Sequence, residues 1–230
     1  MPFKSLYRGK TVFRIEALSD AVFAISVTLL IMSLEVPKTY TELELIIKQF
    51  LPFLATVSMI FFIWWLQNNF FRNYGLDNVT VRFLNLCLLI IILFYVFPLK
   101  FLFTLIVSSI FKINYFESIS NNSLVVITES DLPNLIMFFS VGYALVWLIF
   151  FLLYRHIWLN RTKLKLSHLE FIALLSDKRD ALFQLTIGLT STLFAILGWT
   201  IGSQITFLTI PVWLLVNYFM TSRAKNALRD

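Results

Sequence analysis

"RIEALSDAVFAISVTLLIMSLEVP", residues 14–37, is a long apolar run that begins with charged side chains. Its residues 17–36 are mostly apolar, and about 20 such residues are enough for a helix to cross a bilayer. Asp20 lies just inside this run, where an ionised carboxylate without a partner is costly. The stretch therefore predicts a membrane-spanning helix that must provide a partner for one carboxylate.

The rest of the chain is as apolar as this first run. Of the 230 residues 59% are hydrophobic, and the mean hydropathy is +0.81, whereas about half of a soluble domain is apolar. We therefore expect an all-α integral membrane protein in which residues 1–230 form a single six-helix transmembrane domain. Its spans are expected at about 17–36, 50–70, 83–108, 134–154, 181–202 and 205–221.

The placement of the basic residues predicts the orientation. With the N-terminus inside, the cytoplasmic segments hold 15 of the 19 Lys and Arg, as the positive-inside rule requires. These segments are residues 1–16, 71–82, 155–180 and 222–230, which leaves Lys38, Lys48, Lys100 and Lys112 outside. We expect a multi-pass protein of the cell membrane with both termini in the cytoplasm. The net charge of +6 then indicates contact with anionic lipid rather than with nucleic acid.

Enzyme chemistry finds little support in the sequence. No nucleophile elbow, zinc-binding or phosphate-loop motif is present, and the pairs of intramembrane carboxylates that acid–base catalysis would need are missing. Cys87 is the single cysteine, and His156 and His168 lie outside the expected spans. We expect no catalytic residues, no metal site and no cofactor.

Helical geometry places two kinds of side chain on the first span. At roughly 100° per residue, an apolar stripe with one hydroxyl follows one face, and Asp20 lies roughly on the opposite side. Small residues that favour close helix contact form a ladder beside the stripe. The stripe consists of Ile25, Thr28, Leu29 and Met32 with Leu18 beneath it, and the ladder of Ala17, Ala21, Ala24 and Thr28.

Several polar side chains at the same expected membrane depth are candidate partners of Asp20. A network that satisfies the carboxylate is one interpretation, and an interfacial residue that reaches back toward water is the alternative. The candidates are Arg14 and Ser19 on the same helix, Asn68 and Asn69 near the end of the second span, and Asn85 at the start of the third.

The run from Arg14 to Asp20, with "AVFAISVTLL" after it, closely resembles the RxxxFSD signature and first helix of the transmembrane protein 175 family. This family comprises endosomal and lysosomal potassium channels and their prokaryotic relatives. "WWLQNNFF" (64–71) and "LNLCLLIIILFYVFP" (84–98) resemble the second and third helices. Leu18 replaces the usual Phe, and Asn68 and Asn69 replace the histidines of a WxxHH pattern, although amides can also hydrogen-bond a carboxylate.

The resemblance implies a homotetramer whose first helix lines a central pore. Hydrophobic constrictions then replace a carbonyl filter: Ile25 resembles the narrowest gate, Thr28 a hydroxyl layer, and Leu29 and Met32 further rings. Potassium would pass transiently near Ile25 and Thr28. The expected function is a cation channel with modest selectivity for potassium over sodium. A secondary transporter and a non-conducting membrane scaffold remain alternatives, although a transporter commonly shows internal repeats and the sequence alone shows no evident repeat.

Overall fold

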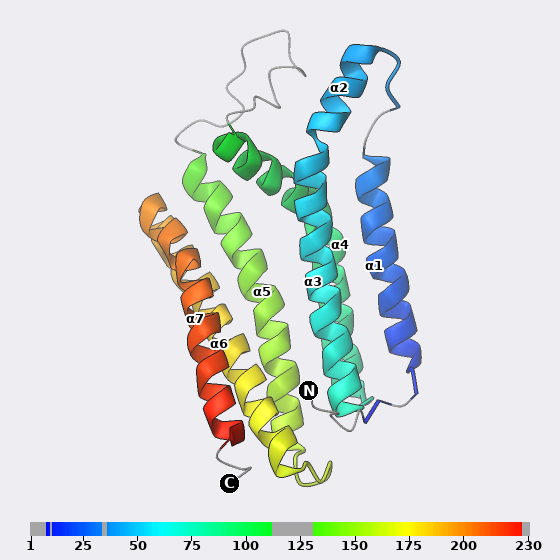
Figure 1. Ribbon diagram of the computed structural model, residues 1–230, viewed down its shortest axis with the longest axis vertical. Helices are drawn as coiled ribbons and strands as arrows, with labels where there is room; N and C mark the ends of the chain where they lie inside the picture. The colour runs from blue at the N-terminus through cyan, green and yellow to red at the C-terminus, as the bar shows by residue number, and fades with distance from the viewer. Residues whose placement is uncertain (1–7, 10, 34–35, 112–130, 227–230) are drawn as a thin grey trace. The chain divides into compact units, whose positions relative to one another are not determined.

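The computed structural model describes residues 8–9, 11–33, 36–111 and 131–226, and all regular secondary structure in these ranges is α-helical (Figure 1). This confirms the all-α class. The helices are α1 (Arg14–Met32), α2 (Tyr40–Lys48), α3 (Phe50–Tyr74), α4 (Val79–Phe111), α5 (Leu132–Leu159), α6 (His168–Ile196) and α7 (Thr200–Asn226).

Five segments of the described chain are long and apolar enough to cross a membrane. They are Arg14–Met32, Tyr40–Tyr74, Val79–Ser108, Leu132–Leu159 and Thr200–Asn217. The first ends before the expected residue 36, and residues 34–35 lie outside the described chain, as does Lys112. The protein is therefore embedded in a membrane by several apolar helices.

The fifth expected span, 181–202, differs from the helices that the structure contains. Helix α6 begins at His168 and carries charged side chains up to Asp180, so its apolar part is shorter than a usual span. It ends at Ile196, and Gly198 follows in the left-handed region with φ of 75°. Residues 200–202 already belong to α7.

The helix ends follow from local chemistry. The Glu16 carboxylate accepts a hydrogen bond of 2.9 Å from the N–H of Phe13, which satisfies one donor at the start of α1. Gly75 ends α3 with φ of 55°, a conformation that glycine adopts without steric cost. A side chain on Gly75 would also collide with the backbone of Arg8, because an added Cβ would lie 2.9 Å from its carbonyl carbon.

Contacts divide the chain into two compact units. The N-terminal unit, Leu6–Gly75 with Leu89–Ile127, contains α1, α2, α3 and most of α4. Within it α1 lies along α3, the blue and cyan helices of Figure 1. The face of α1 that is covered carries Ile15, Ser19, Phe23, Ser26 and Leu30, whose spacing of three and four residues is that of one side of a helix.

The C-terminal unit, Leu76–Leu88 with Thr128–Asp230, contains the start of α4 and the three packed helices α5, α6 and α7. Gly188 allows α6 to approach α5, because a Cβ there would lie 2.8 Å from the Cβ of Ala144. The fully buried hydroxyls of Ser140, Ser191 and Ser203 join the three helices through contacts of 2.7 Å. Small residues and interhelical hydrogen bonds of this kind hold membrane helices together.

Candidate functional site

The stripe expected on the first helix is exposed in the single chain. Ile25 is 53% and Met32 75% accessible, Thr28 is exposed, and Leu29 is half-buried. The covered face of α1 lies on the other side of the helix. Because α1 is an apolar helix with only one face packed within its unit, its second face is free to meet another helix, lipid or a pore.

The small residues beside the stripe are exposed as well. Ala17, Ala21 and Ala24 carry no side chain beyond Cβ, so a partner helix could approach this side of α1 closely. The Thr28 hydroxyl donates a hydrogen bond of 2.9 Å to the carbonyl of Ala24. Since its proton is engaged, the Thr28 oxygen presents lone pairs outward and can act as an acceptor or as a ligand of a cation.

Asp20 lies at the edge between the covered and the exposed faces of α1. It is exposed in the single chain, and its Oδ1 accepts a hydrogen bond of 2.7 Å from the indole Nε1 of Trp64 on α3. A charge-assisted bond of this kind is stronger than a neutral one. The carboxylate thus joins α1 to α3, and its partner Trp64 is not among the partners expected from the sequence.

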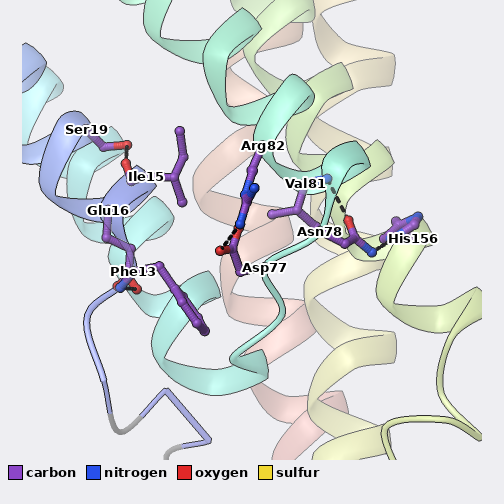
Figure 2. A network of polar contacts seen from close by, with 9 residues as sticks. All are labelled: Phe13, Ile15, Glu16, Ser19, Asp77, Asn78, Val81, Arg82 and His156. Carbon is purple, nitrogen blue, oxygen red and sulfur yellow. Dashed lines mark hydrogen bonds and ion pairs between the residues drawn. The ribbon is translucent and has the colours of Figure 1, made fainter.

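The other expected members of the network on α1 have different roles. Ser19 is fully buried, and its hydroxyl donates a hydrogen bond of 2.7 Å to the carbonyl of Ile15 (Figure 2). Arg14 is exposed at the first position of the helix, and Leu18 is 46% accessible. Ser19 therefore faces the packed side of α1, whereas Arg14 and Leu18 do not.

The three asparagines named as candidate partners of Asp20 have different surroundings. Asn68 on α3 accepts a contact of 3.4 Å from the Nε of Arg72, and Asn69 beside it is half-buried. Asn85 is fully buried on the part of α4 that belongs to the C-terminal unit, whereas Asp20 belongs to the N-terminal unit. The structure thus records Trp64, one turn before Asn68, as the partner of the Asp20 carboxylate.

The far end of α1 is held by a cation. Lys100 on α4 donates a hydrogen bond of 2.8 Å to the hydroxyl of Ser33, which in turn donates to the carbonyl of Leu30 at 2.7 Å. A positive charge near the last turn of a helix interacts favourably with the helix dipole. Contacts at both ends, Glu16 at the start and Lys100 at the finish, thus fix where α1 begins and ends.

A second polar cluster lies at the start of α4, in the C-terminal unit (Figure 2). Asp77 accepts two hydrogen bonds from Arg82, of 2.6 and 2.7 Å, and these hold the pKa of the carboxyl below its usual value. The Asn78 side chain accepts from the N–H of Val81 at 2.9 Å and contacts Nε2 of His156 at 2.8 Å. These contacts order the turn before α4.

Within the described ranges of the chain, no group of three or more His, Cys, Asp or Glu lies close enough together to hold a metal ion. Several of the polar side chains that meet, such as Asp20 with Trp64 and Ser167 with Glu170, join helices or cap their ends. Taken together, the fold and the exposed stripe of α1 define a polytopic helical membrane protein whose first helix carries the candidate functional surface.

Comparison with known proteins shows which family this chain resembles. Residues 14–96 match the family described as endosomal/lysosomal potassium channel TMEM175. A protein of Marivirga tractuosa named "Potassium channel" is 28% identical over 234 residues, which cover 97% of this chain and 94% of that protein. The matches confirm the family resemblance that the sequence predicts.

Two solved structures resemble the fold. A variant of the potassium channel MtTMEM175, in complex with a nanobody fusion, matches with a TM-score of 0.82 and 28% identity, covering 96% of this chain and 99% of that one. A lysosomal potassium-selective channel TMEM175 homolog from Chamaesiphon minutus shares the fold alone, with a TM-score of 0.56 and 17% identity over 89% of this chain and 96% of that one. The relatives form a class of channels, which confirms that the chain is not an enzyme.

Proposed function

We propose that the protein is a potassium-permeable cation channel and that four copies assemble around a pore lined by α1. The observation that carries this proposal is the exposed stripe of Ile25, Thr28 and Met32 on α1. The helix with this stripe lies within the region that matches the TMEM175 family, and the similar proteins are named potassium channels. The exposed alanines beside the stripe suit close contact with the α1 of a neighbouring subunit.

The proposed mechanism is passive flow of a partly dehydrated ion past apolar rings. Four copies of Ile25 form the narrowest ring, which closes when it expels water. Thr28 follows one turn later and offers hydroxyl oxygens that replace part of the hydration shell. Leu29 and Met32 form further apolar rings toward the other end of α1. Apolar rings favour the ion that is easier to dehydrate, so potassium passes more readily than sodium, with modest discrimination.

The proposed topology has six crossings in a single domain, with both termini in the cytoplasm. The five apolar segments supply five crossings, and α6 supplies the sixth although it is less apolar. The charged residues of α6 up to Asp180 then lie at the cytoplasmic end of its crossing, together with the basic residues of the connection between α5 and α6. This arrangement agrees with the positive-inside rule and with contact to anionic lipid.

Potassium flux into liposomes tests the proposal against its alternatives. Purified protein should carry potassium when a membrane potential is imposed, without saturation and without a coupled ion. Flux that saturates and requires a second ion would indicate a transporter, and the complete lack of flux from folded protein would indicate a scaffold. Either result would overturn the proposal. Vesicles without protein are the control.

A further inference from the structure

The two units of the chain contain the same kind of interhelical hydrogen bond. In the N-terminal unit Nε1 of Trp64 donates to Oδ1 of Asp20 at 2.7 Å. In the C-terminal unit Nε1 of Trp213 donates to Oδ1 of Asp180 at 2.9 Å. Each bond joins two helices that pack against each other, α1 with α3 and α6 with α7. In both pairs the carboxylate is on the earlier helix and the indole on the later one.

The sequences around the two carboxylates are similar. "DAVFAISV" (20–27) and "DALFQLTI" (180–187) share the Asp, the Ala after it and the Phe. Four of the remaining positions hold conservative pairs, namely Val with Leu, Ile with Leu, Ser with Thr, and Val with Ile. The likeness thus extends through the two turns of helix that follow each Asp.

The sequences around the two indoles are similar as well. "WWLQNNF" (64–70) and "WLLVNYF" (213–219) share the Trp, the Leu, the Asn and the Phe at the same spacing. Both stretches lie on the second helix of their pair. Similar segments therefore recur in the same order in both hairpins, and a similar hydrogen bond joins them in both.

The hydrogen bonds decide how the two copies correspond. The tripeptide Leu-Ser-Asp occurs at 18–20 and again at 175–177, which alone would pair Asp20 with Asp177. The indole of Trp213, however, donates to Asp180. Asp180 is therefore the counterpart of Asp20, and the Leu-Ser-Asp tripeptide alone would give the wrong register for the repeat.

We infer that α6–α7 is a second copy of the α1–α3 hairpin, in which Asp180 and Trp213 are positioning residues that hold α6 against α7. We call the Asp–Trp hydrogen bond of each hairpin a clasp. The clasp of Asp180 and Trp213 includes one more residue. Asn217, the counterpart of Asn68, donates to the Asp180 carboxylate and to the Ser176 hydroxyl, the latter at 3.1 Å. Bonds to a carboxylate are strengthened where water is scarce, so these contacts fix which faces of the two helices meet.

The two copies differ in how exposed the stripe residues of α1 and their counterparts on α6 are. Leu185 corresponds to Ile25 and is buried, whereas Ile25 is 53% accessible. Gly188 corresponds to Thr28 and packs against Ala144 of α5. The counterparts of Ile25 and Thr28 on α6 are therefore covered within the chain, whereas Leu189, the counterpart of Leu29, is 55% accessible. The inference on the clasp does not depend on ion conduction, because it concerns the packing of each hairpin.

Indole N–H signals in the NMR spectrum of the full chain test the correspondence. In protein labelled with ¹⁵N-tryptophan, Asp180→Asn should shift the Trp213 indole signal and leave that of Trp64 unchanged, while Asp20→Asn should do the reverse. In the unaltered protein the N–H groups of Trp64 and Trp213 should exchange with deuterium more slowly than those of the exposed Trp65 and Trp199. A Trp213 signal that ignores Asp180→Asn, or that exchanges as fast as Trp199, overturns the inference.

Thermal unfolding of single and double variants tests the role of each clasp. Trp213→Phe should lower the melting temperature by about 2–4 °C in the unaltered chain, but by much less in the Asp180→Asn background, because the bond is already weakened there. Trp64→Phe should behave in the same way with Asp20→Asn. Trp65→Phe, the matched control, should have the same small effect in either background. Additive effects of Trp213→Phe and Asp180→Asn would show that the two residues do not act together and would overturn the inference, whatever the outcome of flux measurements.

Discussion

Asp20 shows most clearly which features of a site the sequence predicts and which only the structure shows. The cost of a carboxylate in an apolar run predicts that Asp20 needs a partner, and the candidates included Asn68 on α3. The structure places the bond on the same helix but one turn earlier, at Trp64. An indole is counted as apolar in a hydropathy reading although it carries a donor. The chemistry and the partner helix could be predicted, whereas the donor depends on how α1 and α3 are rotated against each other.

Thr28 provides a test at the scale of one hydroxyl. Thr28→Val keeps the shape of the side chain but removes the oxygen that would replace part of the hydration shell. We expect potassium to lose most of its advantage over sodium, while the yield of folded protein changes little. The reversal potential with potassium on one side of a bilayer and sodium on the other measures this effect.

Thr192→Val is the matched control for Thr28→Val. The Thr192 hydroxyl makes the same kind of bond on α6, to the carbonyl of Gly188 at 2.8 Å. This variant should leave the reversal potential unchanged. If both variants shifted the reversal potential equally, the hydroxyl of Thr28 would have no special role in the ion pathway.

Asp77 provides a test through pH. The hydrogen bonds from Arg82 lower the pKa of the Asp77 carboxyl from its usual 3.8, so the ionised pair stabilises the folded state above the unfolded pKa. This stabilisation is lost as the pH falls through the lowered pKa of the folded state. Melting temperatures measured from pH 6 downward should therefore fall less steeply in acid for Arg82→Gln than for the unaltered chain. Identical pH profiles would contradict a stabilising role of the pair.

At the scale of elements, most helices could be predicted from hydropathy, and α6 shows the limit of that approach. The expected span began at 181 because charged residues precede it. The structure begins α6 at His168, where the Ser167 hydroxyl accepts from the N–H of Glu170 at 3.3 Å and the Glu170 carboxylate accepts from the N–H of Ser167 at 2.7 Å. This capping box is readable in the sequence as Ser-x-x-Glu. The start of α6 was thus predictable from capping, although not from apolar length.

The position of α1 in the assembly can be tested by cysteine crosslinking. In a Cys87→Ala background, Ile25→Cys and Met32→Cys should form disulfides between subunits or react with small permeant thiol reagents, because the proposed rings bring equivalent residues close to a shared axis. Denaturing gels under non-reducing conditions measure the dimer band. Protein that is monomeric both in mild detergent and in lipid would contradict the assembly.

Phe23→Cys serves as the control for these positions. Phe23 is 2% accessible and lies on the covered face of α1. It should neither form crosslinks between subunits nor react with the reagents. Equal reactivity at Phe23 and Ile25 would indicate that α1 is loosely held and would remove the basis for a defined stripe.

At the scale of the whole molecule, the exposed side of α1 is the feature that requires an explanation. The residues there combine apolar side chains, alanines and one threonine, a composition that suits contact with other helices better than contact with lipid alone. On α6, Leu185 and Gly188, the counterparts of Ile25 and Thr28, are buried, and Gly188 packs against Ala144 of α5. The stripe and the resemblance to a channel family could be predicted from the sequence. The exposure of the stripe depends on which face of α1 packs against α3, and only the structure shows this.

The most direct test of the channel is the current through Ile25→Asn in planar bilayers, with potassium on one side and sodium on the other. An amide hydrogen-bonds the water that an isoleucine ring expels, so the constriction should stay wet and the leak current should rise. Ile31→Asn makes the same chemical change at a residue that is 54% accessible on α1 but outside the stripe, and it should leave the current unchanged. A pore lined by the stripe predicts a raised current in Ile25→Asn alone. An unchanged current in well-assembled Ile25→Asn protein, or an equal rise in Ile31→Asn, would contradict a pore lined by this stripe.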